Sequence, residues 1–177
     1  MAHFAVSAVG RDRPGIVSAI AEGLLELEGN VEDSRMTILR GRFAVMLIVS
    51  LPEDQNGGAL ERRLAPVRER LGLDALTVSE VGELEAAGTS PSHVITVYGA
   101  DHPGIVHTIT AALAERGVNI TDLQTKLAGG AGSPVYVMML EVELGDCSLE
   151  DLDAALVAVA ERAAVEVSIG ELDSAAL

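Results

Sequence analysis

The sequence predicts an α+β protein that consists of two successive βαββαβ units. Two observations support this prediction. Residues 4–33 align without gaps with residues 93–122, and eleven of these thirty positions are identical. In both halves, apolar residues alternate where a strand is expected and recur every three to four residues where a helix is expected. The constant offset of 89 residues indicates a duplicated domain, because it is too long for a solenoid repeat.

The first half contains six predicted elements. They are a strand at 3–10, a helix from Pro14, strands at 30–40 and 42–51, a second helix ending at Leu71, and a strand at 74–82. The strand at 42–51 is almost entirely apolar, so it is expected at the centre of its sheet. Pro66 should kink the second helix because it lacks an N–H, and Gly72 is placed to end it.

The second half follows the same order. Its predicted elements are a strand at 93–99, a helix at 103–117, strands at 119–128 and 134–144, a helix at 149–162 and a strand at 164–170. We therefore expect a first domain at 1–83, a linker at 84–91 and a second domain at 92–177. Each domain should be a ferredoxin-like sandwich, an antiparallel sheet with its helices on one face.

The composition excludes several classes of function. The formal net charge of −15 would repel a phosphate backbone, and two Tyr and two Phe are few for stacking bases, so direct nucleic-acid binding is not expected. A single cysteine permits neither an intramolecular disulfide nor a Cys-rich metal site. No apolar run approaches the length of a membrane span, and the start does not resemble a secretory signal. The sequence predicts a cytoplasmic protein that does not contact membranes.

Both halves share a loop between the first predicted strand and the first helix. It reads Gly10-Arg-Asp-Arg-Pro-Gly-Ile-Val17 in the first half and Gly99-Ala-Asp-His-Pro-Gly-Ile-Val106 in the second. Free N–H groups at a helix start, with the positive end of the helix dipole, can bind a carboxylate, and a neighbouring Asp can meet an ammonium group. The loop thus predicts an α-amino-acid site. The predicted contact residues are Asp12, Arg13, Pro14, Gly15, Ile16, Asp101, His102, Pro103, Gly104 and Ile105.

An alternative interpretation of the loop needs no ligand. Asp-x-Pro-Gly is also an ordinary helix-start sequence, in which Asp caps the helix and Pro takes the first helical position. A second shared feature, Asn30 and Asn119, leaves the same choice open. Each Asn could adopt the left-handed conformation at a helix end, or its amide could bind the ligand at an edge between domains.

Other residues give weaker signals. His102 and His107 are five positions apart and do not share a helical face, so we predict no metal site. His102 occupies the place of Arg13, so we expect a polar residue that faces the loop. Alternatively, a protonated His102 could attract a ligand carboxylate and make binding pH-sensitive. Cys147 precedes a predicted helix, and Gly129–Ser133 is expected to be a simple hairpin turn. No nucleophile elbow or phosphate loop is present, so no catalytic residue and no cofactor are predicted.

With these motifs the sequence resembles the ACT-domain family, whose βαββαβ modules sense amino acids. Within that family it is similar to the glycine-cleavage-system transcriptional repressors, which have two such domains. The resemblance rests on Asp12-Arg-Pro-Gly-Ile-Val17, Gly29-Asn-Val-Glu-Asp-Ser-Arg-Met36 and Phe43-Ala-Val-Met-Leu-Ile-Val49. It implies ligand binding at ACT–ACT interfaces through the first loop and the Asn that starts the second strand. The intact motif at Asp101–Val106 is a departure, because those repressors tend to lose it in their second copy.

The predicted function is therefore non-catalytic regulation. The resemblance implies a small amino acid, glycine being one candidate, and a protein partner such as a transcription factor. The alternatives are an interaction module without a ligand and a regulatory subunit of an amino-acid enzyme. An exposed sheet edge also favours a homodimer.

Overall fold

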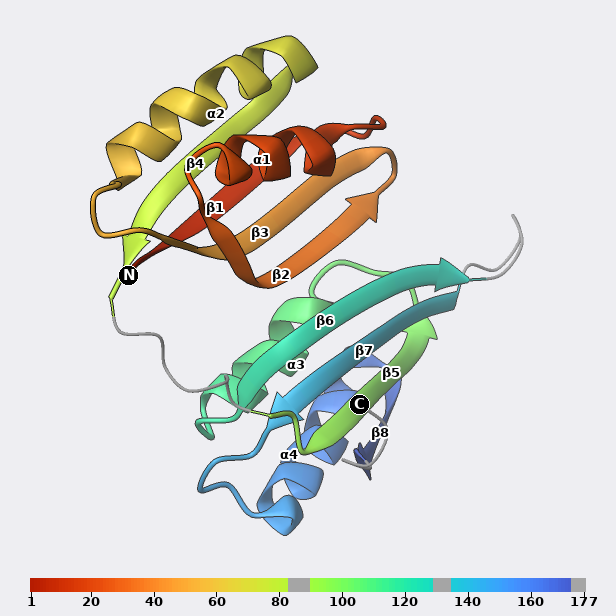
Figure 1. Ribbon diagram of the computed structural model, residues 1–177. Helices are drawn as coiled ribbons and strands as arrows, with labels where there is room; N and C mark the ends of the chain where they lie inside the picture. Colours follow the sequence, from red (N-terminus) through yellow and green to blue (C-terminus); the bar gives the residue numbers. More distant parts are fainter. Residues whose placement is uncertain (83–89, 129–134, 173–177) are drawn as a thin grey trace. The chain divides into compact units, whose positions relative to one another are not determined.

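The computed structural model describes residues 1–82, 90–128 and 135–172, and the chain divides into two compact units, Met1–Ala86 and Ala87–Leu177. Each unit has the order βαββαβ (Figure 1). The first contains β1 (Ala2–Arg11), α1 (Ile16–Leu25), β2 (Asn30–Leu39), β3 (Arg42–Leu51), α2 (Gly57–Leu71) and β4 (Leu73–Val81). The second contains β5 (His93–Ala100), α3 (Ile105–Ala114), β6 (Asn119–Ala128), β7 (Val135–Glu143), α4 (Leu149–Ala163) and β8 (Val165–Glu171).

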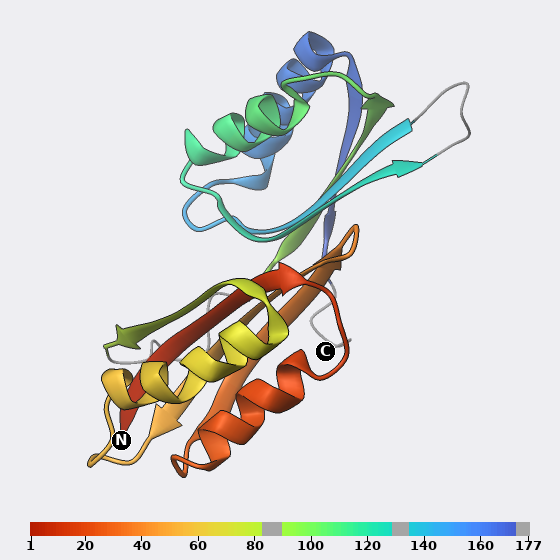
Figure 2. The same ribbon diagram turned by 90° about the horizontal axis from the view of Figure 1, so that it is seen from above.

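Each unit has one four-stranded antiparallel sheet. The strand order is β2-β3-β1-β4 in the first unit and β6-β7-β5-β8 in the second. The apolar strand β3 is central, as predicted, because it pairs with β1 on one side and β2 on the other. Both helices of a unit cover the same face of its sheet (Figure 2). The predicted ferredoxin-like α+β fold is confirmed in both halves.

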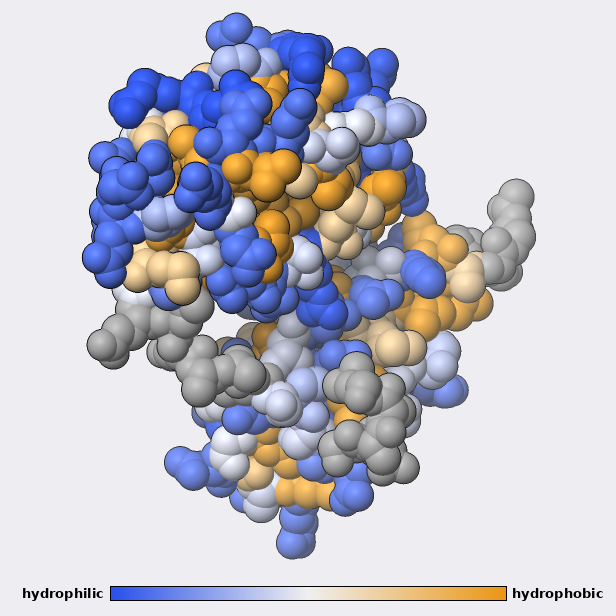
Figure 3. Space-filling model, viewed as in Figure 1, coloured by the Kyte–Doolittle hydropathy of each residue, from blue (hydrophilic) through white to orange (hydrophobic). Residues whose placement is uncertain are grey.

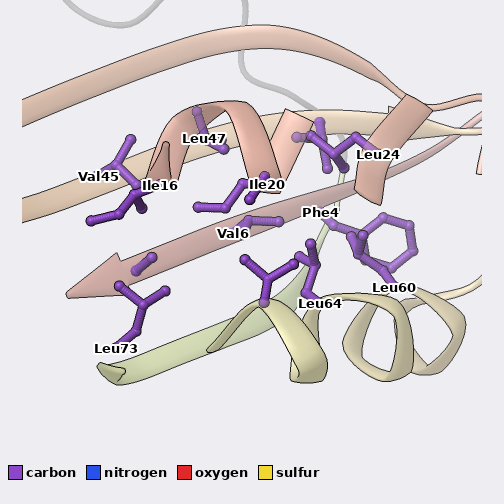
Figure 4. Packing of buried hydrophobic residues seen from close by; sticks show 14 of the residues in the cluster. Phe4, Val6, Ile16, Ile20, Leu24, Val45, Leu47, Leu60, Leu64 and Leu73 are labelled. Atoms are coloured by element: carbon purple, nitrogen blue, oxygen red, sulfur yellow. The ribbon is translucent and has the colours of Figure 1, made fainter. Parts of the chain in front are cut away.

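The core of the first unit follows from the alternation along β1. Phe4, Val6 and Ala8 are buried and face the helices, while the residues between them lie on the other face. Ile16 and Ile20 of α1 pack against this row (Figure 4). The apolar residues whose spacing predicted the helix are thus the ones that α1 buries against the sheet. The second unit repeats this arrangement with its own separate core.

The helix ends agree with the sequence in some places and differ in others. α2 continues through Pro66 and ends at Gly72, whose φ of 60° is left-handed, as predicted for that glycine. α1 and α3 both begin two residues later than expected, at Ile16 and Ile105. The cause lies in the glycines that precede these helices, Gly15 and Gly104.

The hairpin between β2 and β3 is a tight turn in which both Arg40 and Gly41 have positive φ, at 49° and 77°. Two left-handed residues in succession match the twist of the flanking strands. The corresponding turn predicted at Gly129–Ser133 lies outside the described residues, as does most of the predicted linker at 84–91.

Apolar residues also reach the surface (Figure 3). All ten residues of the edge strand β2 are exposed, among them Met36 and Ile38. No helix in the described parts of the chain is long and apolar enough to cross a membrane.

Candidate functional site

The shared loops have nearly the same backbone geometry in both units. Gly15 precedes α1 with φ 93° and ψ −3°, and Gly104 precedes α3 with φ 101° and ψ −12°. This left-handed conformation is strained for residues with a Cβ, so it explains why both copies have glycine there. It also explains the late helix starts, because a left-handed residue cannot belong to the right-handed helix.

One part of the ligand-free interpretation, the capping of each helix by Asp, is wrong. Within the described residues, no side chain caps α1 or α3, so neither Asp12 nor Asp101 acts as the predicted cap. Pro14 is not the first helical residue either, since Gly15 separates it from α1. The first N–H groups of a helix have no carbonyl partner within it. Both loops therefore place acidic side chains near helix starts that lack a side-chain cap.

In the first unit the loop is fixed by the β2–β3 turn. The backbone N–H of Asp12 donates to the carbonyl of Gly41 over 2.9 Å. Asp12, Arg13, Pro14 and Gly15 are exposed, so solutes can reach them. Their common position beside one helix start is the arrangement that the sequence predicted.

Two predicted contact residues point the other way. Ile16 is only 1% exposed and Ile105 only 2%, and both side chains belong to the hydrophobic cores. Only their backbone groups remain available to a ligand. Their role is to anchor the first turn of each helix under the loop.

In the second unit the loop borders an open hollow of about 500 Å³. The hollow brings the five predicted loop residues together with three others. Its lining is Asp101, His102, Pro103, Gly104, Ile105, Val106, His107 and Tyr136. A free amino acid fits within that volume. An acidic group, a helix start and a phenol thus border one space.

Sequence reasoning missed Tyr136. It pairs with Gly99 across the β5–β7 ladder, as Phe43 pairs with Gly10 in the first unit. Extending the repeat beyond the longer second hairpin would have revealed this equivalence. Burial raises the pKa of the Tyr136 phenol, and its hydroxyl donates to Met138 Sδ over 3.9 Å.

The ring of His102, which takes the place of Arg13 in the second loop, contacts two backbone carbonyls. Its Nε2 lies 2.7 Å from the carbonyl oxygen of Ala163, and its Nδ1 lies 3.1 Å from that of Pro103. These hydrogen bonds, first the one to Pro103, raise the pKa of His102. Both ring nitrogens therefore face backbone carbonyls and not the space that a ligand carboxylate would occupy.

Asn30 lies far from the loop of its own unit. It pairs with Ser50, which lies opposite His3 at the start of β1. Asp12 follows Arg11, the last residue of β1. The eight residue steps from His3 to Arg11, at about 3.3 Å each, give a separation of roughly 26 Å. One small ligand cannot contact both side chains within the same unit.

A polar cluster surrounds Asn30 instead. The Ser50 hydroxyl donates to Glu32 Oε1 over 2.6 Å, and the Asn30 amide donates to the same oxygen over 3.3 Å. The bond from Ser50, followed by that from Asn30, lowers the pKa of Glu32. Asn119 starts β6 at the equivalent place, where it pairs with Glu143. The sequence predicted the position of both Asn residues on the strand but not their distance from the loops.

Metal and thiol chemistry receive no support from the described residues. Across 1–82, 90–128 and 135–172, no group of three His, Cys, Asp or Glu side chains gathers as metal ligands would. Cys147 lies beside Ser148, the residue that caps α4, and its thiol donates to the Ser148 carbonyl over 3.4 Å.

Two models of the ACT domain match the chain, one at residues 2–77 and one at residues 93–159. The glycine cleavage system transcriptional repressor of Escherichia coli is 28% identical over 125 residues, which cover 70% of this chain and 64% of the repressor. Phosphoserine phosphatase SerB2 of Mycobacterium tuberculosis is 27% identical over 166 residues, which cover 93% of this chain and 39% of the phosphatase. The chain thus spans less than two thirds of either relative.

A solved structure gives a likeness over the whole chain. An unknown protein from Galdieria sulphuraria superposes with a TM-score of 0.81 and 30% identity, covering 97% of this chain and 99% of that chain. The two matched segments, 2–77 and 93–159, fall on the two βαββαβ units described above. The chain belongs to the ACT-domain family and contains two ACT domains in tandem.

Proposed function

We propose that this protein is a regulator that binds a small α-amino acid at its two β–α loops. The observation that supports this most is the shared backbone of the loops. In both units an Asp lies close to a left-handed glycine and a helix start without a side-chain cap. The helix N–H groups suit the ligand carboxylate, and the Asp suits its ammonium group. Because the Asp does not cap the helix, the helix start alone does not explain its presence in both copies.

Glycine is the first ligand to test. The repressor relative is named for the glycine cleavage system. A ligand that also touched Asn30 would need the loop of another ACT domain, for example from a second copy of the chain. A homodimer is one assembly that would supply such a loop.

Thermal unfolding with a panel of amino acids tests the proposal. A ligand at about 100 times its dissociation constant adds roughly 2.7 kcal/mol to the folded state, which raises the melting temperature by several degrees. We expect Asp12→Asn together with Asp101→Asn to abolish the rise. Asp54→Asn and Asp146→Asn change the same charge at exposed positions outside the loops and should leave it intact. An absence of any shift at millimolar amino acid would refute the sensor.

The protein partner is a separate part of the proposal. The acidic net charge of −15 argues against direct contact with DNA, so control of transcription would act through another protein. Co-purification with and without the amino acid tests this, and we expect the amount of bound partner to change with the ligand. A partner yield that is the same in both states would rule out ligand control of that contact.

A second candidate function is regulation of an enzyme of amino-acid metabolism. It is favoured by the alignment with a phosphoserine phosphatase, which spans 93% of this chain but only 39% of the phosphatase. The two candidates share the ligand site and differ in the partner. The identity of a protein retained by the chain separates them.

A further inference from the structure

His102 links the second loop to the far end of α4. Its ring contacts two carbonyl oxygens, that of Ala163 over 2.7 Å and that of Pro103 over 3.1 Å. A carbonyl oxygen only accepts hydrogen bonds, and a neutral imidazole carries only one N–H. Both contacts are therefore hydrogen bonds only when the ring is protonated. In the neutral form one ring nitrogen would face a carbonyl oxygen with its lone pair.

The end of α4 is a place where a cation stabilises the fold. Ala163 is the last residue of the helix, where carbonyls lack helical partners and the helix dipole is negative. The next residue, Ala164, has a left-handed φ of 50°, where the first unit has Gly72 with φ 60°. A left-handed alanine is strained. The contact of His102 with the Ala163 carbonyl lies directly before this left-handed residue.

The first unit lacks this histidine. Arg13 occupies the equivalent loop position and is exposed. Arginine keeps its charge throughout the physiological range, whereas histidine changes charge within it. The charge at this position therefore depends on pH in the second loop and not in the first.

Four other ionisable groups lie near His102. Asp101, in the same loop, favours the charged ring, and hydrogen bonding to Pro103 and Ala163 together with this carboxylate raises the pKa of His102. His107 and Tyr136 line the same hollow, and burial keeps the tyrosine neutral. Arg162 lies in the last turn of α4, next to Ala163.

We infer that His102 is a positioning residue whose imidazolium form holds the loop at 101–104 against the end of α4 with two hydrogen bonds, and whose deprotonation leaves only one of them and so loosens that loop. Amino-acid binding by the second unit would then weaken as pH rises, while binding by the first would not. This pH dependence of binding rests on the function proposed above. The hydrogen bonds between the loop and α4 do not. The second unit should also be more stable below the ordinary pKa of 6.5 and lose this gain as pH rises through the raised pKa of His102.

NMR titration of the whole chain without ligand tests these hydrogen bonds directly. Between pH 5.5 and 8.5, we expect the His102 ring and the backbone amides of Gly104 and Ala164 to shift with one common midpoint above 6.5. The variant His102→Gln should remove the shift at both amides. His107→Gln, a change to the other histidine of the hollow, should preserve it.

Three results would overturn the inference. They are amides that do not move with the His102 ring, amide shifts that persist in His102→Gln, and amide shifts that vanish in His107→Gln. Should His102→Gln fail to fold, the titration of the unaltered chain still decides the question. His102→Arg supplies a fixed charge, as in the first unit, and should hold the loop amides at their low-pH positions at every pH. Since no amino acid is added, failure here leaves the ligand proposal untouched.

Discussion

At the scale of single residues, the backbone of Gly15 and Gly104 distinguishes the two shared loops from ordinary helix starts. Their φ values of 93° and 101° are available to glycine but costly for other residues. A Cβ added at either position would meet nothing within 4 Å. The cost of a substitution therefore lies in the backbone and not in crowding.

We predict that Gly15→Ala and Gly104→Ala each lower the free energy of unfolding by about 1–2 kcal/mol, measured by urea denaturation. Gly82→Ala is the matched control, because a Cβ there also meets open space and the backbone is not left-handed. That change should be neutral or slightly stabilising. Equal losses at all three positions would contradict the argument.

The same residues show what the sequence could and could not predict. The repeat located Asp12 and Gly15 correctly, and it identified a helix start beside them. Hydrophobic spacing carries no information on the sign of φ, so the helices were expected two residues too early. The contact between His102 and Ala163 joins residues 61 positions apart, and no local pattern predicts such a pair.

At the scale of strands and helices, one further glycine lies in the strand before each loop. Gly10 and Gly99 lie near the end of a central strand, where the neighbouring strand comes close. A Cβ on Gly99 would lie 2.6 Å from Val165 Cγ1, and one on Gly10 would lie 2.9 Å from Leu73 Cδ2 and 3.1 Å from its Cα. Glycine at a strand position often marks this kind of approach.

We expect Gly99→Ala to destabilise the second unit by roughly 1–3 kcal/mol, because β8 must move away from β5. Gly170→Ala, on the neighbouring strand β8, is the control, since its Cβ would come no nearer than 4.0 Å to Val94 Cγ1. Chemical denaturation of both variants measures the difference. A larger loss at the control position would show that strand crowding is not the cause.

Element order and the central place of β3 followed from periodicity and from the nearly continuous apolar run of β3, although Met46 on its face away from the helices is exposed. The distance between Asn30 and Asp12 did not follow from composition or periodicity. That distance depends on the antiparallel register, which the sequence pattern leaves open until the strands are paired. The polar cluster of Asn30, Glu32 and Ser50 was missed for the same reason.

At the scale of the whole molecule, the buried apolar residues of the described ranges form two clusters, one in each unit. The first is built by residues such as Phe4, Val6 and Leu64, and the second by residues such as Ile95, Ile109 and Leu140. Among the described residues, the members of the first cluster all lie in Met1–Ala86 and those of the second all lie in Ala87–Leu177. Each unit thus meets the basic requirement for independent folding.

We predict that fragments 1–86 and 87–177, produced separately, each fold and each unfold in one cooperative transition. Far-UV circular dichroism with thermal and urea unfolding measures this. A fragment with native helix content but no cooperative transition would mean that its core depends on the other half of the chain.

The left-handed glycines also have a consequence for the genetics of this protein. Every single-base change that replaces a glycine codon with another amino acid introduces a residue with a Cβ. At Gly15 and Gly104 a serine and a leucine should be almost equally harmful, because the backbone penalty does not grow with side-chain size. At Gly99, where Val165 is in the way, the harm should rise with the volume of the new residue. A saturation-mutagenesis map of this chain would therefore show uniform intolerance at the loop glycines and graded intolerance at the strand glycine.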